Sequence, residues 1–137
     1  MPQLTMATQL ELALRLIVAA ALGGIIGWQR EKAHKPAGFR THILISIGAA
    51  LFTVVSINGF PGGVPSQVAA GVVTGVGFLG AGVIMHRTRT VEGLTTAASV
   101  WAVAAIGLAS GAGMYLLAIV TTIIIFLVLF FRDPGTG

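Results

Sequence analysis

The sequence contains no cysteine. This absence excludes disulfide bridges, thiolate metal sites and a cysteine nucleophile, and it leaves the redox compartment undetermined. Acidic residues are also scarce, because Asp and Glu together number four in 137 residues. They are Glu11, Glu31, Glu92 and Asp133. A hard dication such as Mg²⁺ is usually held through carboxylates and waters, so the sequence offers little material for such a site.

Charged residues of both signs make up only 9% of the chain, whereas hydrophobic residues make up 55% and the mean hydropathy is +0.95. A soluble domain carries about 25% charged residues. Several apolar runs match the roughly 17–25 residues that a membrane-spanning helix needs. We therefore predict an integral membrane protein that is surrounded by the lipid bilayer. The net charge of +4 is interpreted as a record of topology, and no nucleic-acid partner is expected.

The apolar runs predict an all-α, polytopic bundle of five transmembrane helices. The predicted helices cover residues 8–28, 42–57, 67–85, 95–110 and 112–131. Almost no loop separates the last two helices, so they should form a tight antiparallel hairpin that turns on Gly111 and Gly113. Residues 1–137 are expected to form a single transmembrane domain.

Basic residues predict the orientation of the bundle. Connector 29–41 carries four Lys or Arg residues, connector 58–66 carries none and connector 86–94 carries two. Short loops rich in Lys and Arg stay in the cytoplasm. The N-terminus is therefore predicted outside and the C-terminus inside. A reporter fused after Ser66 should report the outer side of the membrane, and a cytoplasmic signal would contradict this topology.

Small residues are abundant, with 19 glycines in the chain. Helices in lipid associate through close contact, and Gly at a spacing of four residues lets two backbones approach. The candidate packing positions are Gly23, Gly27, Gly71, Gly75, Gly77, Gly80, Gly82, Gly107 and Gly111. The third helix carries glycine on two faces, which predicts that it is the packing centre.

Charge inside the spans is rare. Arg15 lies within the first apolar run, and Glu11, four residues earlier on the same face, is predicted to pair with it. Trp101 lies in the middle of the fourth helix and should need a partner for its N–H. No buried Asp, Glu or His is expected for a proton relay or a cation path. No set of nucleophile, base and orienting group is evident, so no enzyme, cofactor or metal is predicted.

Two segments at the predicted cytoplasmic side are alike, AGFRTH at 37–42 and EGLTTA at 92–97. The similarity indicates two parallel copies of a helix–loop–helix unit, with the fifth helix added. In each copy a threonine, Thr41 or one of Thr95 and Thr96, is predicted to cap the next helix. Arg40 is predicted to bridge to Glu31, to Glu92 or to carbonyl groups at a helix end, which would order the two loops.

Three ordered motifs, GWQREKAHKPAGFRTH, GVGFLGAGVIM and EGLTTAASVWAVAAIGLASGAG, resemble the membrane domain of the MgtC/SapB family of bacterial inner-membrane proteins. The resemblance covers nearly all of residues 12–131. It implies a multi-pass protein of the bacterial plasma membrane. Some members of that family are linked to growth in low magnesium, to survival inside macrophages and to inhibition of the ATP synthase, and the resemblance itself does not imply transport.

Many positions agree with the family motifs. They are Arg30, Pro36, Ala37, Gly38, Arg40, Thr41, Gly75, Phe78, Leu79, Gly80, Gly82, Gly93, Leu94, Thr95, Thr96 and Ala97. Other positions depart, because Gln29 stands where relatives commonly have Glu and Glu92 stands where a basic residue is common. Gln67 and Gly71 replace a common Arg and Gln, and connector 58–66 lacks the usual acidic residue. The soluble C-terminal domain of many relatives is not expected in FRDPGTG.

Two hypotheses from different classes follow. The favoured one is a non-enzymatic regulator or adaptor, linked by resemblance to magnesium homeostasis or stress adaptation, whose cytoplasmic face binds another membrane protein or a second copy in a homo-oligomer. The candidate residues of that face are Arg30, Glu31, Arg40, Thr41, Arg87, Glu92, Thr95 and Thr96. The alternative is a small ion transporter or channel for Mg²⁺, in which GVGFLGAG is unwound within the membrane.

Overall fold

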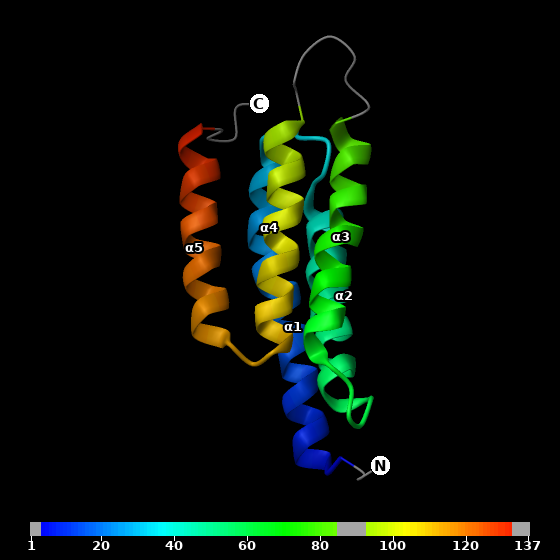
Figure 1. Ribbon diagram of the computed structural model, residues 1–137. Helices are drawn as coiled ribbons and strands as arrows, with labels where there is room; N and C mark the ends of the chain where they lie inside the picture. Colours follow the sequence, from blue (N-terminus) through cyan, green and yellow to red (C-terminus); the bar gives the residue numbers. More distant parts are fainter. Residues whose placement is uncertain (1–3, 85–92, 133–137) are drawn as a thin grey trace.

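The computed structural model describes residues 4–84 and 93–132, and in this part of the chain it is all-helical (Figure 1). The helices are α1 (Met6–Lys32), α2 (Phe39–Asn58), α3 (Pro65–Ile84), α4 (Leu94–Gly111) and α5 (Tyr115–Arg132). The predicted number and order of helices are confirmed. The main difference is that α1 continues to Lys32 and α2 begins already at Phe39. Most of the charged stretch 29–42 is therefore helical, and the connector shrinks to residues 33–38.

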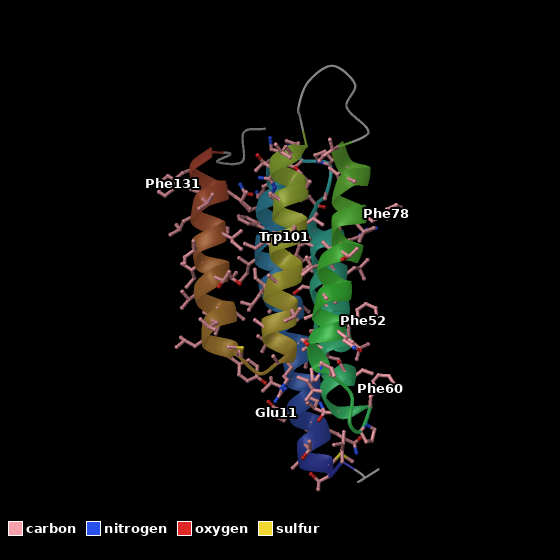
Figure 2. All side chains as sticks on the ribbon, viewed as in Figure 1. Glu11, Phe52, Phe60, Phe78, Trp101 and Phe131 are labelled. Carbon is pink, nitrogen blue, oxygen red and sulfur yellow. The ribbon has the colours of Figure 1, made fainter. Side chains whose placement is uncertain are left out.

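The surface of the bundle is that of a membrane protein. Helices α1 to α4 are long and apolar enough to cross a bilayer, and α5 has a shorter apolar stretch over Tyr115–Phe131. Large apolar side chains such as Phe52, Phe78 and Phe131 project outward (Figure 2). Trp101 belongs to this surface and is 54% exposed. The partner that its N–H should need is not found among the described residues, because the side chain faces outward from α4.

Helix α4 is the centre of the bundle. It contacts each of the other four helices, whereas α3 contacts only α2 and α4 (Figure 1). One apolar core lies between α4, α1 and α5 around Ile26 and Ile106, and another lies between α4, α2 and α3 around Val76 and Val100. The prediction that the third helix is the packing centre is therefore wrong.

The physical reason lies in the glycines of α3. A Cβ atom built on several of them would meet no atom within 4 Å, and these are Gly71, Gly75, Gly77 and Gly82. Only Gly80 of the predicted positions on α3 faces a neighbour, with Ala97 of α4 at 3.5 Å from such an atom. Glycine at helical spacing permits another helix to approach closely, but it does not by itself create a contact with one.

The close approaches occur instead on both sides of α2. A Cβ on Gly23 of α1 would lie 2.7 Å from Cβ of Ser46, and one on Gly27 would lie 2.8 Å from Cα of Phe39. From the α4 side, a Cβ on Gly107 would overlap the carbonyl oxygen of Ser46. One on Gly111 would lie 2.9 Å from Cα of Ala50. Four of the predicted packing glycines thus hold α2 between α1 and α4.

Glycines also begin α2 and α4. The N-cap of α2 is Gly38 and that of α4 is Gly93, whose φ is 92°, and neither helix has a side-chain cap. The prediction that threonines cap these helices was wrong, because both helices start earlier than expected. The two N-cap glycines stand at equivalent places in the two similar segments. Between α4 and α5, Gly113 has a φ of 81°, as a tight hairpin requires.

The end of the bundle opposite connector 33–38 is held by a polar cluster. Nε of Arg15 lies 3.0 Å from both carboxylate oxygens of Glu11, which confirms the predicted pair. Arg15 also donates to the carbonyl oxygen of Gly111 at 2.9 Å, and the Tyr115 hydroxyl donates to Glu11 at 2.8 Å. Figure 2 places Glu11 beside the turn between α4 and α5. The pair therefore ties α1 to the last two helices.

Candidate functional site

Arg30 is the starting point of the candidate site. It lies in the last turn of α1, where a cation is favoured by the helix dipole, and its side chain is 0% exposed. Charged side chains are almost never fully buried unless they are paired. Its Nη2 atom donates to the hydroxyl oxygen of Thr96 on α4 at 3.1 Å. A charge-bearing link therefore joins α1 to α4 at the end of the bundle that carries connector 33–38, which we name the connector end.

His42 makes a second link at the same end. Its side chain is 0% exposed on α2. Nδ1 lies 2.8 Å from the carbonyl oxygen of Gly38, and Nε2 lies 2.9 Å from the hydroxyl oxygen of Ser99 on α4. The Ser99 hydroxyl in turn lies 2.7 Å from the carbonyl oxygen of Thr96. The imidazole thus connects the start of α2 to the helix that receives Arg30.

The hydrogen atoms of this chain of contacts can be assigned in two ways. A carbonyl only accepts, so Nδ1 of His42 must carry a proton toward Gly38. Ser99 has one hydroxyl hydrogen and two acceptors within reach, Nε2 of His42 and the carbonyl oxygen of Thr96. With a neutral imidazole, Ser99 donates to one of them at a time. With a doubly protonated imidazole, both contacts are hydrogen bonds together.

A serine beside a histidine is also the pair that many hydrolases use. Here Ser99 is 3% exposed and is bonded to its own helix, and His42 points its other nitrogen at the N-cap of its own helix. Both side chains are thus occupied in joining α2 to α4. The geometry is that of a structural link within the membrane domain.

Two further polar side chains extend these links. Nε2 of Gln29 donates to the carbonyl oxygen of Leu129 on α5 at 3.4 Å. The Ser46 hydroxyl donates to the carbonyl oxygen of Ala19 on α1 at 2.7 Å. We call the whole set the Arg30 network, and it consists of Gln29, Arg30, His42, Ser46, Thr96 and Ser99. It joins α1, α2, α4 and α5 through polar side chains that are buried inside the bundle.

The structure divides the predicted interaction residues into two groups. Arg30 and Thr96 come together, but they are buried and do not form an exposed face. The exposed ones are Glu31, Arg40, Thr41 and Thr95. Arg87 and Glu92 lie outside the described residues. The motif residues thus lie partly in the interior of the connector end and partly on its surface.

Arg40 differs from its prediction. Its side chain is exposed, and among residues 4–84 and 93–132 it has no hydrogen-bond or ion-pair partner. The predicted bridge to Glu31 is absent, because the Glu31 carboxylate accepts the backbone N–H of Phe39 at 3.4 Å. The predicted alternative, Glu92, lies outside the described part of the chain.

Sequence reasoning missed Gln29, His42 and Ser99. His42 was placed beside a connector because α2 was predicted to begin there, and one further helical turn puts it inside the bundle. Ser99 is a small residue in an apolar run, and nothing local distinguishes it from a packing residue. Gln29 was noted only as a departure from the family motif. A usable signal would have been the i, i+3 spacing of Thr96 and Ser99 on one face of α4.

Metal-binding groups do not gather in the described core. Over residues 4–84 and 93–132, no three His, Cys, Asp or Glu side chains are arranged to hold a metal ion. The buried polar residues of the same ranges are Gln29, Arg30, His42, Ser46, Thr53, Ser56, Thr96, Ser99, Ser110 and Thr122. The interior thus offers hydroxyls, amides, an imidazole and one guanidinium, and its charged member is a cation.

Comparison with known proteins gives consistent matches. The model of the MgtC family matches residues 16–136. The chain is 50% identical over 127 residues to the "Putative magnesium transporter YhiD" of Escherichia coli (strain K12), which covers 87% of this chain and 59% of that protein. It is 46% identical over 107 residues to protein MgtC of Brucella abortus (strain 2308), covering 78% of this chain and 45% of that one.

Protein MgtC of Salmonella typhimurium (strain LT2) is 45% identical over 112 residues, which cover 82% of this chain and 48% of the relative. The chain therefore spans about half the length of the curated relatives that it matches. No solved structure gives a significant match.

Proposed function

The chain belongs to the MgtC family, as its three motifs predict, and from this premise we propose that it is a non-enzymatic regulator or adaptor serving magnesium homeostasis or stress adaptation. It is a multi-pass protein of the bacterial inner membrane. The name of the Escherichia coli relative supports the link to magnesium. In this proposal the chain acts by contact with another membrane protein or with a second copy of itself, and it neither passes ions nor turns over a substrate.

The observation that carries this proposal is the burial of Arg30. Two positive unit charges 4 Å apart repel each other by about 4 kcal/mol at an effective dielectric constant of 20. The repulsion between one such charge and a dication is twice as large. Over the described residues, no His, Asp and Glu side chains cluster in an arrangement that could hold a metal ion. A Mg²⁺ ion that entered the bundle at the connector end would therefore meet the Arg30 guanidinium without the set of carboxylates that usually holds this ion in the described core. This environment favours a regulator over a cation carrier within one chain.

The Arg30 network also supports a docking role for the connector end. It holds the end of α1, the start of α2 and the start of α4 in one arrangement. Connector 33–38 is closed by backbone hydrogen bonds of 3.0 Å, from N–H of His34 to Glu31 and from N–H of Lys35 to Arg30. His34 has a φ of 57°, which non-glycine residues seldom adopt. A short loop held this way loses little conformational entropy when it binds a partner.

The second candidate is a transporter formed by several chains. The observation in its favour is the open glycine surface of α3, where Gly71, Gly75, Gly77 and Gly82 have no neighbour within one chain. The segment GVGFLGAG is helical throughout, contrary to the unwound form that this alternative predicted. An assembly of these helices would therefore have to unwind part of α3 before its backbone carbonyls could bind an ion. The name of the Escherichia coli relative also supports a transporter.

Magnesium flux separates the two candidates. The purified protein would be reconstituted into liposomes that enclose a Mg²⁺-sensitive dye, beside empty liposomes and liposomes with an established Mg²⁺ channel. We expect uptake equal to that of empty liposomes. The same protein should restore growth in low Mg²⁺ to a bacterium that lacks its own homologue. Saturable uptake that depends on this protein would overturn the regulator proposal and favour the assembly of α3 helices.

A further inference from the structure

An apolar groove runs between α2 and α3. Its volume is about 720 Å³, within the range of pockets that hold small ligands. Its walls include Leu44, Gly48 and Phe52 of α2 and Gly71, Gly75 and Leu79 of α3. The glycines create the space, because a Cβ on Gly48, Gly71 or Gly75 would meet nothing within 4 Å. Buried Ala49, Val72 and Val76 form its floor.

The groove has the dimensions of one leaflet. Its wall on α3 extends from Val68 to Leu79, and eleven rises of about 1.5 Å make about 17 Å along the helix axis. The hydrocarbon core of a bilayer is about 30 Å thick, so the groove covers a little more than half of it. Its walls include the outward-facing residues Leu44, Phe52 and Leu79 on the lipid side of the bundle. An extended hydrocarbon chain matches both the shape and the apolar character of this space.

The exposed side chain of Arg40 lies beyond Leu44, at the edge of the groove nearest the connector end. Arg40 precedes Leu44 by four residues on α2, so their Cβ atoms are about 5–6 Å apart. Its guanidinium is exposed and has no hydrogen-bond or ion-pair partner within residues 4–84 and 93–132. A guanidinium binds phosphate oxygens with two parallel hydrogen bonds, which makes arginine well suited to a phosphodiester.

The nearest carboxylate does not compensate this charge. Glu31 accepts the N–H of Phe39, and Phe39 packs on Gly24 and Gly27 of α1. At 100° per residue, Phe39 lies about 150° around α2 from the centre of the groove wall. The Glu31 carboxylate is therefore on the α1 side of α2. By the same measure Arg40 lies about 110° from the centre of the groove wall, beyond its edge at Leu44, so a phosphate bound to Arg40 would lie at that outer edge of the groove.

We propose that this groove binds an anionic phospholipid of the surrounding leaflet, with its phosphate on Arg40 and one acyl chain between Leu44 and Leu79. Charge complementarity favours this occupant over a second copy of the chain. Each copy has a net charge of +4 and only four acidic residues, of which Glu11 is already paired with Arg15. A second copy would cover the apolar walls but would bring a net positive charge to Arg40, whereas an anionic lipid brings a negative one.

The test measures lipid binding to the purified protein in a neutral detergent. Phosphatidylglycerol or phosphatidylcholine would be titrated in, and bound lipids counted by native mass spectrometry, with the thermal midpoint Tm followed in parallel. We expect phosphatidylglycerol to bind more tightly and to raise Tm more than phosphatidylcholine. Arg40→Gln should weaken phosphatidylglycerol binding about tenfold, as expected for the loss of a charge-assisted hydrogen bond, and leave phosphatidylcholine nearly unchanged.

Matched variants separate the headgroup from the groove. Lys32→Gln removes the same charge at the connector end, but from a side chain that stacks over Trp28 at 5.4 Å, and it should leave the preference intact. Gly75→Leu places a side chain in the groove, starting from a position where the new Cβ meets no atom within 4 Å, and should weaken both lipids. Gly77→Leu, at an equally open site outside the groove, should weaken neither.

Three outcomes would overturn the proposal. Equal effects of Arg40→Gln and Lys32→Gln would mean that general positive charge attracts the lipid. Equal effects of Gly75→Leu and Gly77→Leu would mean that the groove does not take part. A lipid-independent dimer that Gly75→Leu disrupts would mean that a second copy occupies the groove.

Discussion

Gly107→Ala should be among the most destabilising single substitutions in the chain. The added Cβ would overlap the carbonyl oxygen of Ser46 and lie 2.9 Å from its Cα, so it would meet backbone atoms that cannot rotate away. Overpacking of a well-packed interior usually costs about 1–3 kcal/mol, and a backbone clash belongs at the upper end of that range. Ser46 also donates to α1, so a displaced α2 would strain both of its contacts. Thermal unfolding in one detergent would measure the loss.

The matched controls are Gly75→Ala and Gly77→Ala on α3, where the new atom meets open space. These should change the free energy of unfolding by no more than about 0.5 kcal/mol. A small gain is also consistent, because alanine is a better helix former than glycine. If Gly75→Ala lowered Tm as much as Gly107→Ala, the assignment of α4 rather than α3 as the packing centre would be wrong.

Arg30→Lys is expected to lower the free energy of unfolding by about 1–3 kcal/mol. The variant should also fail to restore growth in low Mg²⁺ to a bacterium that lacks its own homologue. Lysine keeps the charge, but its shorter side chain and compact ammonium group do not reproduce the planar guanidinium that bonds to Thr96. A buried acceptor on α4 would then lose its donor, and a buried charge would be held less well. The measurement combines Tm in detergent with growth of the complemented strain.

Arg40→Lys is the control for this substitution, since it makes the same chemical change on an exposed side chain of the same end. It should change the free energy of unfolding by no more than about 0.5 kcal/mol. Arg30→Lys protein with unchanged Tm and growth would show that the Arg30 network does not hold the connector end together. If growth were lost while Tm stayed unchanged, Arg30 would instead act directly in the regulatory function and not through stability.

The helices were predictable because their apolar runs are long and their ends are marked. The Glu11 and Arg15 pair was predictable as well, since four residues on one helix face bring the two side chains together. The position of α3 was not predictable. Its glycines show where a neighbour is sterically allowed, but whether one is present depends on the faces of α1, α2 and α4. These faces compete for contact, and local sequence does not rank them.

The candidate site was predictable only in part. Arg30 and Thr96 were both singled out by motif, but the bond between them spans 66 positions of sequence and no local pattern encodes it. His42 and Arg40 were misjudged for the same reason, which is the start of α2. Beginning the helix at Phe39 turns His42 inward against Ser99 and turns Arg40 outward. An error of three residues at a helix end thus exchanges an interior residue for a surface one.

The contact between Arg15 and the carbonyl oxygen of Gly111 bears on how the chain is made. Ninety-six positions separate the two residues, and chains are synthesised at about 5–20 residues per second. Arg15 is therefore made roughly 5–20 s before Gly111, its later partner. During this time Glu11 is the partner available to Arg15 on α1. The Tyr115 hydroxyl arrives later still, at the start of α5. The polar cluster at that end therefore forms late in biogenesis, and it closes the bundle only after α4 and the start of α5 have been made.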